Sequence, residues 1–485
     1  MKLKELISHA KEYGFIFPSS EIYDGLSAAY DYGPNGVLLK NNLKAYWWKS
    51  MVQMHENIVG IDTAIFMHPK TWKASGHVDA FNDPLIDNKD SKKRYRADVL
   101  IEEHIEKIEG KIERYKASAA DITARLATLM TAGDMEGLYN LIVELDIVDP
   151  VSGTRNWTEV RQFNLMFSTQ LGNIAGEEGK LYLRPETAQG IFVNFLNVQK
   201  STRQKIPFGI AQIGKAFRNE IIARQFVFRM REFEQMEMQF FVRPAEEMKF
   251  YEYWKATRMA WHTAIGTSAD HLRYHDHDNL AHYANAAVDI QYQFPFGFRE
   301  LEGIHSRTDF DLTSHQAHSG KKIQYFDPEI NESYIPYVVE TSIGLDRMFL
   351  AILSETLVEE TVPDADGKDA TRLVMKIHPA LAPNKCAILP LLKNKPELVE
   401  KAKAIFDTLR YDFSCQYDEK DAIGRRYRRQ DAIGTPYCIT VDFDTLEDDT
   451  VTIRDRDTLL QERIPIDQLA ARIKSNIGFS TLLKG

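Results

Sequence analysis

The sequence predicts an α+β protein built from several domains. Its 485 residues exceed the roughly 150 that one domain usually holds. Strand-like runs fill the middle of the chain, a helical block precedes them, and strand and helix patterns alternate again near the C-terminus. We therefore expect a core in two parts (1–85 and 157–358), a mostly helical insertion (86–156), a linker (359–371) and a small α/β domain (372–485).

The insertion is recognised by its periodicity, whereas the first segment mixes helix and strand patterns with many aromatic residues. Isoleucines recur at spacings of three and four with Glu and Lys between them, which is the period of an amphipathic helix. These are Ile101, Ile105, Ile108 and Ile112. Turn-forming residues at 149–153 close this block.

Beyond the middle segment, residues 361–369 contain turn formers and lack apolar periodicity, so they are typical of a loop. The following patterns alternate. Residues 386–392 predict a strand, 396–409 a helix and 437–443 a second strand. This alternation predicts a small α/β domain.

Composition indicates an ordinary globular chain of the reducing cytoplasm. The 60 basic and 70 acidic residues give a net charge of −10, and 44% of residues are hydrophobic, which excludes a disordered or collagen-like chain. No apolar run reaches the roughly 18 residues of a membrane span, and the N-terminus lacks the apolar core of a secretory signal. The three cysteines are too few for a disulfide framework or a four-cysteine zinc site.

Several common nucleotide and hydrolase motifs are absent from the sequence. No two glycines are spaced as Gly-x-Gly, and no Gly-Lys is followed by Ser or Thr. There is also no Gly-x-Ser-x-Gly elbow and no His-Glu-x-x-His helix. If the protein binds a nucleotide, we expect it to do so with side chains, chiefly arginines.

Two strand-like stretches, 207–220 and 228–242, frame a short loop at 221–225. Because side chains alternate along a strand, the first stretch aligns Arg218 with Glu220. One face of the second presents Arg229, Arg231, Phe233, Gln235 and Glu237. Guanidinium groups bind phosphate oxygens in bidentate fashion and an aromatic ring stacks on a base, so this hairpin suits a nucleotide. A salt-bridged strand surface is the alternative.

A second element combines a strand at 337–342 with Gly-Leu-Asp-Arg at 344–347 and an apolar helix at 348–353. Arg347 in the first turn of a helix opposes the helix dipole. A bound anion would relieve this unfavourable placement. An ion pair with a neighbouring carboxylate is the alternative.

These residues resemble the signature motifs of class II aminoacyl-tRNA synthetases. Arg218 in Phe-Arg-Asn-Glu, followed by Arg229, Phe233 and Glu237 at intervals of four, is similar to motif 2. The element at 344–347 is similar to motif 3. The order of further stretches, from about Tyr13 to the C-terminus, resembles glycyl-tRNA synthetases of the homodimeric type. These stretches are 30–34, 96–98, 184–190, 231–237 and 307–312.

The resemblance implies an antiparallel β-sheet core flanked by helices, with motif 1 and the dimer interface in residues 1–85. It also implies an anticodon-binding domain at the C-terminal end. The implied reaction converts glycine and ATP to glycyl-adenylate and pyrophosphate, and then transfers glycine to the 3′ end of tRNA(Gly). The implied partners are therefore glycine, ATP, tRNA(Gly) and a second copy of the chain.

The resemblance also implies roles in ATP binding. Arg218 would hold the α-phosphate, Phe233 would stack on adenine and Arg347 would bind the γ-phosphate. Arg218, Arg347 and Glu300 are the expected catalytic residues, and Glu300 is expected to hold Mg²⁺. The expected ATP site comprises Arg218, Asn219, Glu220, Phe228, Arg229, Met230, Arg231, Glu232, Phe233, Glu300, Leu301, Gly344, Leu345, Asp346 and Arg347.

Glycine has no side chain to grip, so its ammonium group must be recognised and larger amino acids refused. The resemblance implies that Glu186, Glu237 and Glu340 do this, with Ser342 on the same strand face as Glu340. Carboxylates supply charge-assisted hydrogen bonds and crowd the space that a Cβ would need. The expected glycine site comprises Arg96, Glu186, Phe233, Glu234, Gln235, Met236, Glu237, Glu340, Thr341, Ser342, Ile343 and Gly344.

The C-terminal segment differs from the acidic body, because residues 373–485 contain 18 basic against 17 acidic residues. Four arginines around Tyr427 suit phosphates and a stacked base, and we expect them to bind the tRNA anticodon region. They are Arg425, Arg426, Arg428 and Arg429. A basic surface loop balanced by nearby acidic residues is the alternative.

A histidine group could suggest a metal, but we expect no structural zinc. Its members are His271, His275, His277 and His282, and zinc would usually need sulfur or carboxylate support. Some relatives of the family carry a cysteine pair just before the Arg-Ala-Asp stretch, where this chain has 90–95 without cysteine. A satisfied or solvated strand edge is therefore our interpretation.

Two other functions compete with the enzyme. A non-catalytic nucleic-acid-binding paralogue should have lost the ATP arginines or the acidic pocket, and both are present. A synthetase for a larger amino acid should not need so many glutamates. The sequence therefore favours glycine.

Overall fold

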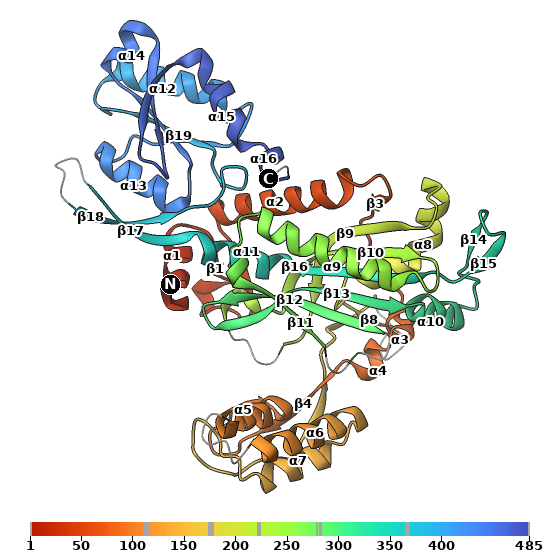
Figure 1. Cartoon of the computed structure of the whole chain (residues 1–485). Helices are drawn as coiled ribbons and strands as arrows, with labels where there is room; N and C mark the ends of the chain where they lie inside the picture. The colour runs from red at the N-terminus through yellow and green to blue at the C-terminus, as the bar shows by residue number, and fades with distance from the viewer. Residues whose placement is uncertain are drawn as a thin grey trace. The chain divides into compact units, whose positions relative to one another are not determined.

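The computed structural model describes residues 2–109, 116–172, 179–220, 225–277, 280, 284–363 and 369–483. They form two compact units. The first comprises Met1–Ala64, Glu186–Lys215 and Gln225–Gly485, and the second comprises Ile65–Pro185 and Ala216–Arg224. Figure 1 shows the elements along the chain.

A seven-stranded sheet forms the centre of the first unit (Figure 1). Its strand order is β11-β12-β13-β16-β10-β9-β3. The pairings from β11 to β10 are antiparallel, and β3 pairs with β9 in parallel. The antiparallel core that the sequence predicts is confirmed. The strands are β3 (Ile58–Gly60), β9 (Phe208–Phe217), β10 (Glu232–Val242), β11 (Leu272–Asp276), β12 (Ala286–Phe294), β13 (Gly297–Thr308) and β16 (Tyr337–Gly344).

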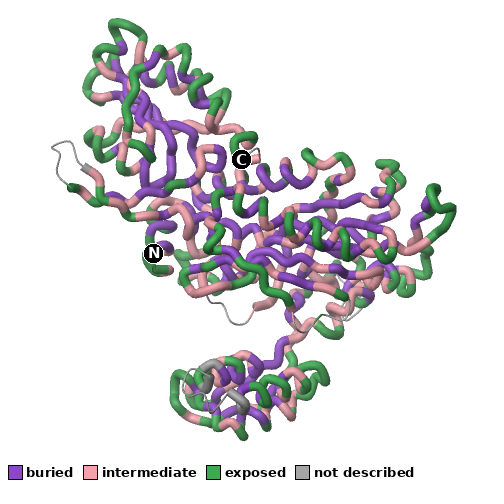
Figure 2. Tube along the Cα trace, in the orientation of Figure 1, coloured by how far each residue is buried: buried purple, intermediate pink, exposed green. Residues whose placement is uncertain are grey.

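Helices pack against this sheet and close the main hydrophobic core. The strands β16 and β10 and the helix α11 supply many of its buried side chains, and they run through the buried zone of Figure 2. The helices of this part are α1 (Leu3–Glu12), α2 (Pro34–Trp48), the π-helix η2 (Lys49–Gln53), α8 (Ala188–Thr202), α9 (Glu247–Ala264), α10 (Phe310–Ser319) and α11 (Leu345–Thr356). Its short elements are β1 (Ile16–Pro18), η1 (Glu21–Tyr23), β2 (Tyr30–Tyr32), η5 (Phe226–Phe228), η6 (Ala269–His271), β14 (Tyr325–Asp327) and β15 (Glu332–Tyr334).

The strand predicted from Phe228 begins later, at Glu232. Residues 226–228 form a short 3-10 helix instead, and Gln225 and Phe226 before it adopt positive φ angles of 70° and 60°. Arg229 and Arg231 therefore precede the strand and do not share its regular face. Alternation within β10 does hold from Phe233 onward.

The second unit contains a three-stranded sheet, β5-β4-β6, with three helices that share its hydrophobic core. Ile101 and Ile105 are buried, as their spacing predicts, whereas Ile112 lies outside the described residues. The elements are α3 (Pro69–Ala74), α4 (His77–Ala80), β4 (Asn82–Asp87), β5 (Arg94–Arg96), α5 (Ala97–Glu109), α6 (Lys116–Ala132), α7 (Met135–Glu144), β6 (Arg161–Asn164), β7 (Ser168–Gln170) and β8 (Lys180–Tyr182).

The C-terminal part is the predicted α/β fold, with strand order β20-β19-β21-β22-β23 and its own buried core. The two predicted strands and the predicted helix are present as β19, β21 and α12. The elements are β19 (Cys386–Pro390), α12 (Pro396–Leu409), β20 (Cys415–Tyr417), α13 (Ile423–Ile433), β21 (Tyr437–Val441), α14 (Phe443–Asp448), β22 (Thr450–Asp455), β23 (Gln461–Pro465), η7 (Ile466–Gln468), α15 (Leu469–Ile477) and α16 (Ser480–Leu483).

The predicted linker is shorter than expected. β17 (Leu357–Pro363) and β18 (Asp369–Met375) pair in antiparallel register from Leu357 with Met375 to Pro363 with Asp369. Neither strand alternates regularly between apolar and polar residues, so the period that would predict a strand is missing from both. The rest of the expected loop, 364–368, lies outside the described residues.

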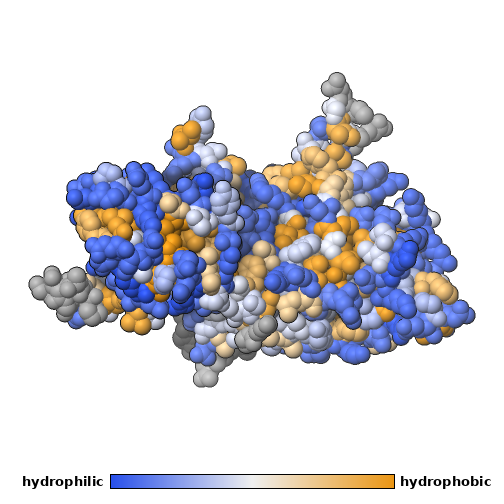
Figure 3. All heavy atoms as spheres, turned by 90° about the horizontal axis from the view of Figure 1, so that it is seen from above, coloured by the Kyte–Doolittle hydropathy of each residue, from blue (hydrophilic) through white to orange (hydrophobic). Residues whose placement is uncertain are grey.

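The face of the molecule drawn in Figure 3 is largely hydrophilic and carries separate apolar patches. Large apolar side chains are also exposed in the connection from β1 to β2, where Ile22 is 87% and Tyr23 80% accessible. None of the described helices combines the length and the apolar character that a bilayer crossing requires.

A buried ion network joins the C-terminal part to β18. Asp431 of α13 is 1% exposed. It accepts from Arg372 Nη1 at 2.7 Å and from Arg454 Nη1 and Nη2 at 2.8 and 3.0 Å. Removing the carboxylate from such a buried network leaves positively charged guanidinium groups without full compensation.

We therefore expect Asp431→Ala to destabilise this part of the chain by about 3–5 kcal/mol, because the buried Arg454 guanidinium loses its carboxylate and Arg372 is left with the carboxylate of Glu360. Calorimetry should show a transition shifted to lower temperature. Asp444→Ala is the control, because the Asp444 side chain is 73% exposed and lies 3.7 Å from Arg463. Equal melting of the two variants would contradict a stabilising role of Asp431.

Candidate active site

The register of three neighbouring strands brings two of the predicted glutamates together. Side chains at paired positions of β13, β16 and β10 lie on one sheet face in two adjacent rows. The first row is His305, Glu340 and Gln239, and the second row is Gly303, Ser342 and Glu237. Glu237 and Glu340 are thus diagonal neighbours. We call this face, together with Glu186, the acidic pocket.

Three donors from the flanking strands hold the Glu340 carboxylate. The His305 Nδ1 atom lies 2.8 Å from Oε1. Oε2 accepts from Gln239 Nε2 at 2.6 Å and from Arg307 Nη1 at 3.1 Å. Arg307 is the extra residue of a β-bulge, because Ser306 and Thr308 pair with consecutive residues of β16. Bulges re-aim side chains in this way.

The second glutamate has neutral partners. Glu237 is 2% exposed, and Thr187, at the start of α8, donates a hydrogen bond to its Oε2 atom. Ser342 forms a further side-chain hydrogen bond with it. Hydroxyl groups at these positions stabilise a carboxylate but bring no positive charge.

Arg307 also begins a chain of contacts that leads to Glu186. Its Nε and Nη2 atoms donate to the Asp311 carboxylate at 2.9 and 3.1 Å. Gln189 Nε2 then donates to Asp311 at 2.9 Å and to Glu186 Oε1 at 3.0 Å. The half-buried Glu186 is therefore positioned by α8 and α10 rather than by the sheet.

This arrangement gives the neighbouring carboxyl groups of Glu237 and Glu340 very different pKa values. Burial, together with the charges of Glu340 and Glu186, raises the pKa of Glu237 to about 8. Burial would raise the pKa of Glu340 as well, but Arg307 and His305 lower it to about 2. The pKa values of the two carboxyl groups are therefore moved in opposite directions, so that Glu340 ionises much more readily than Glu237.

The predicted motif 3 arginine lies at the start of α11, as expected. Its Nη1 atom is 2.9 Å from Glu300 Oε2 and donates to the Glu300 carbonyl at 3.2 Å. Nε donates to the Phe228 carbonyl at 3.2 Å, and the guanidinium lies 4.3 Å from the centre of the Phe228 ring. Arg347, Glu300 and Phe228 thus form one group. The ion pair that the sequence left open as an alternative is present.

Two predicted substrate residues lie on the opposite sheet face. Glu234 alternates with Phe233 and Gln235 and forms an ion pair with Lys40 at 2.7 Å. Asp346 also pairs with Lys40, at 2.9 Å, and accepts from the Glu234 backbone N–H at 2.7 Å. These groups tie α2 and α11 to β10. We therefore leave the two carboxylates out of the substrate pocket.

Several predicted apolar residues place their side chains in the main hydrophobic core. They are Met230, Met236, Leu301, Ile343 and Leu345. Thr341 also alternates away from the pocket and is buried. Any contact of these residues with a ligand would use their backbone. Gly344 has no side chain and ends β16 beside Arg347.

Two further residues of the predicted ATP site contact other parts of the first unit. Arg231 Nη1 donates to the Ser27 carbonyl at 3.2 Å. Glu232 forms an ion pair with Lys215 of β9. Arg229 leads into β10, whereas Phe233 and the buried Gln235 lie within it, and Phe233 packs at the edge of the core.

The remaining predicted residues belong to the second unit. Arg96 lies 3.1 Å from Asp83 and also pairs with Asp98. Arg218 Nε donates to the Pro185 carbonyl at 3.1 Å, and its guanidinium lies 5.4 Å from the centre of the Phe81 ring. The adjacent residues Asn219 and Glu220 are half-buried.

The four C-terminal arginines lie on helix α13 rather than on a loop, and they differ in exposure. Arg425 and Arg428 are exposed. Arg429 is half-buried and pairs with Asp418 and Asp421 at 3.0 and 3.3 Å. Arg426 is 1% exposed and donates to the carbonyls of Pro390, Asp418 and Leu391. Because this guanidinium is inside the domain, the prediction that it contacts tRNA is corrected.

The histidine group divides into separate pairs. His271 lies 2.8 Å from Glu355, and His277 lies 3.0 Å from Asp289. His275 is exposed on β11, and His282 lies outside the described residues. Within the described part of the chain, no three His, Cys, Asp or Glu residues are grouped so that they could hold a metal ion.

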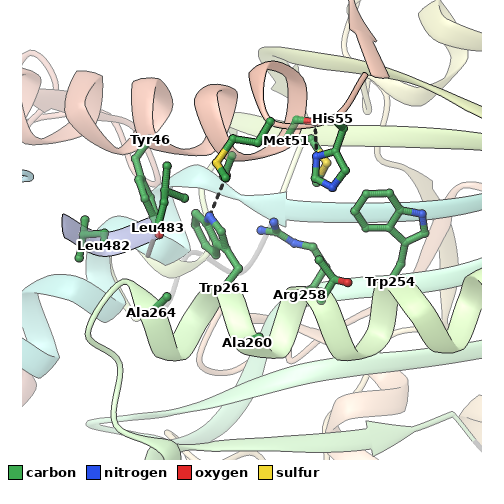
Figure 4. Close-up of a pocket in the computed structure, with 13 residues that line it drawn as sticks. Tyr46, Met51, His55, Trp254, Arg258, Ala260, Trp261, Ala264, Leu482 and Leu483 are labelled. Atoms are coloured by element: carbon green, nitrogen blue, oxygen red, sulfur yellow. Dashed lines mark hydrogen bonds between the residues drawn. The ribbon is translucent and has the colours of Figure 1, made fainter. Parts of the chain in front are cut away.

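A separate pocket of about 320 Å³ lies between α9 and the end of α2 (Figure 4). Tyr46, Trp254 and Trp261 form aromatic walls, and Trp261 donates to Ser50 at 2.9 Å. Arg258 reaches into it and is neutralised by Glu302 at 2.6 Å. Its lining residues include none of the predicted substrate residues, so the acidic pocket remains the candidate site.

Sequence reasoning missed the residues that hold the glutamates. They are Thr187, Gln189, Gln239, His305 and Asp311, and no role was assigned to Arg307. Gln239 could have been found, because it lies two residues after Glu237 and therefore on the same face of a predicted strand. The cross-strand partners on β13 were not accessible, because strand pairing cannot be inferred from either strand alone.

Comparisons with known families cover most of the chain. "tRNA synthetase class II core domain (G, H, P, S and T)" matches residues 171–356. "Glycyl-tRNA synthetase insertion domain 1" matches residues 83–119 and 109–165. "Anticodon binding domain" matches residues 385–476.

Curated relatives match at nearly full length. The glycine–tRNA ligase of Chlorobaculum tepidum is 54% identical over 96% of this chain and 98% of its own length. That of Staphylococcus haemolyticus is 51% identical over 98% of this chain and 99% of its own. Among solved structures, one titled as the RNA binding domain of threonyl-tRNA synthetase from Cryptosporidium parvum superposes with a TM-score of 0.63 at 17% identity. It covers 99% of both chains, which shows a shared fold. The chain belongs to the glycine–tRNA ligase family of class II aminoacyl-tRNA synthetases.

Proposed function

We propose that this protein is a glycine–tRNA ligase that uses the acidic pocket to recognise glycine. The observation that carries the proposal is the pair of buried glutamates on β10 and β16, in the same sheet as the strand β13 that carries Glu300 and beside the turn from β16 into α11 that carries Arg347. The enzyme forms glycyl-adenylate and pyrophosphate from glycine and ATP. It then transfers glycine to the 3′ end of tRNA(Gly).

Glycine is recognised by its ammonium group. Glu340 offers a carboxylate that is already ionised, and Glu186 offers a second at the pocket's half-buried side. Glu237 ionises when the ammonium arrives, because an adjacent positive charge stabilises its carboxylate. The three glutamates also occupy the space around the α-carbon, and close-packed walls turn an added methyl group into a clash.

ATP binding replaces contacts within the protein: Arg347 leaves Glu300 for a phosphate, and Glu300 becomes available to Mg²⁺. Arg347, now paired with Glu300, transfers to the γ-phosphate, and Arg218 holds the α-phosphate. Phe233 stacks on adenine. Mg²⁺ typically uses one or two carboxylates together with substrate phosphates, so the half-exposed Glu300 fits this role.

The reaction needs no nucleophile from the enzyme. A carboxylate oxygen of glycine attacks the α-phosphorus, the new P–O bond forms, and pyrophosphate leaves with the electrons of the broken bond. The protein contributes positioning and neutralisation of the developing charge.

The other segments serve tRNA binding and assembly. The segment 372–485 binds the anticodon region with Arg425, Arg428 and Arg429, and the segment 86–156 is an insertion into the catalytic core of 1–85 and 157–358. The exposed apolar residues between β1 and β2 suit a dimer interface. We place the homodimer in the cytoplasm, where its tRNA partner is found.

Glu186→Gln should raise the KM for glycine by roughly tenfold, because one charge-assisted hydrogen bond becomes neutral. The KM for ATP should not change. Glycine-dependent ATP–pyrophosphate exchange measures both, with alanine and serine as non-substrates. Glu329→Gln is the control, because the Glu329 side chain is 60% exposed and pairs with Arg243. An unaltered glycine requirement in Glu186→Gln would remove Glu186 from the pocket.

Glycine binding at pH 7 should release nearly one proton per site. With a pKa of about 8, Glu237 is mostly protonated before binding and loses its proton beside the ammonium. Binding should therefore strengthen by about fivefold as the pH rises from 7 to 8. Calorimetry in two buffers of different ionisation enthalpy measures the release, which Glu237→Gln should abolish. Proton uptake, or release that persists in the variant, would contradict this assignment.

Charge reversal at Arg425 and Arg428 should weaken tRNA binding by roughly tenfold and flatten its salt dependence, because phosphate contacts are lost. Pyrophosphate exchange, which needs no tRNA, should be unchanged. Arg410→Glu is the control, since Arg410 is also exposed but lies at the end of α12. If exchange fell together with tRNA binding, the two arginines would instead maintain the fold.

A further inference from the structure

We propose that His305 is a positioning residue of the glycine pocket, and that Gly303 leaves the room into which its imidazole folds. The inference rests on the proposed function, because the group that His305 positions is the glycine-binding carboxylate of Glu340.

The first observation is the contact itself. His305 and Glu340 are directly paired across β13 and β16, and the Nδ1 atom lies 2.8 Å from Oε1. Because Glu340 is ionised beside Arg307, its oxygen accepts and His305 Nδ1 carries the hydrogen. With the hydrogen on Nδ1, the ring is a fixed donor to Oε1.

The second observation is how the donors divide between the two oxygens. Arg307 and Gln239 donate to Oε2, whereas His305 donates to Oε1. Turning about the terminal bond moves both oxygens, and such torsions otherwise have broad energy wells. Donors on Oε2 together with His305 on Oε1 therefore fix the plane of the carboxylate and the direction of the lone pairs that meet the ammonium, and His305 supplies the contact on Oε1.

The third observation is the close approach of Gly303. A Cβ built on Gly303 would lie 2.9 Å from His305 Cε1 and 3.3 Å from Nε2. The imidazole thus lies over the glycine backbone on the pocket face, where Gly303 is paired with Ser342. Any larger residue would push the ring away from Glu340.

Part of the histidine group that the sequence singled out borders this arrangement. His277 lies 3.0 Å from Asp289, which is paired with Gly303 on the next strand. The His277 and His305 rings are 6.0 Å apart. The pair of His277 and Asp289 thus lies beside the His305 ring and limits its outward movement. Glu340, as a wall of the pocket, then keeps out a substrate Cβ only while His305 holds it.

The test compares two variants of nearly equal shape. Asn places an amide N–H close to the position of imidazole Nδ1, whereas Leu has no donor. In glycine-dependent pyrophosphate exchange, His305→Leu should raise the KM for glycine by about tenfold and increase activation of alanine relative to glycine. His305→Asn should restore most of the loss. The KM for ATP should stay within about twofold in both variants.

His271→Leu is the matched control, because it removes a histidine that lies at the same 2.8 Å from a glutamate, Glu355, outside the pocket. Its KM for glycine should equal that of the unaltered protein. Gly303→Ala is the second variant and should resemble His305→Leu.

The outcomes distinguish a failure of the proposed function from a failure of the role proposed for His305. If the unaltered protein shows no glycine-dependent exchange, the proposed function fails and the inference with it. If the unaltered protein is active and His305→Leu has the same KM for glycine, the inference alone fails. The inference also fails if His305→Asn and His305→Leu raise the KM values for glycine and ATP equally and lower the melting temperature to the same extent. That pattern would mark a merely structural role of His305.

Discussion

The cross-strand register of β13, β16 and β10 is the constraint on which the site depends. It sets Glu340 opposite His305 and Gln239, and Ser342 opposite Glu237. Two buried carboxyl groups close to each other cannot both ionise without compensation. The fold resolves this conflict by supplying charge to one glutamate and only hydroxyl groups to the other.

Under the proposed function, this division prepares the pocket for a small cation. The ionised Glu340 would attract an ammonium group, while a protonated Glu237 would avoid an uncompensated charge until the ammonium binds. A shift of one register position would turn every one of these side chains to the opposite face. The site is therefore as stable as the sheet, and strand pairing, rather than flexible loops, determines its geometry.

The same sheet explains why motif residues have different duties. Glu237 and Glu234 belong to one motif, yet the first faces the pocket and the second pairs with Lys40 on the other face. Arg347 and Asp346 are adjacent in the chain, yet only Arg347 lies with Glu300. Strand alternation and helix geometry thus let one short stretch serve both substrate binding and attachment of α2.

Much of this could be predicted from local patterns. Short-range rules predict the turn from β16 into α11 and the C-terminal α/β alternation. They also predict that Phe233 and Glu237 lie on one face of β10. The rules failed where the structure depends on distant partners. The β-bulge at Arg307, the His305 contact and the burial of Arg426 depend on strands and loops remote in sequence. The paired flanks of the linker could not be predicted because neither strand alternates regularly between apolar and polar residues.

A crystal structure with a non-hydrolysable glycyl-adenylate analogue would show where the substrate ammonium binds. We expect the ammonium nitrogen within hydrogen-bond distance of Glu237 and Glu340, with the Glu340 carboxylate still held by His305, Gln239 and Arg307. An ammonium group bound elsewhere, or a Glu340 side chain that has left His305 to reach it, would rule out this role of the acidic pocket.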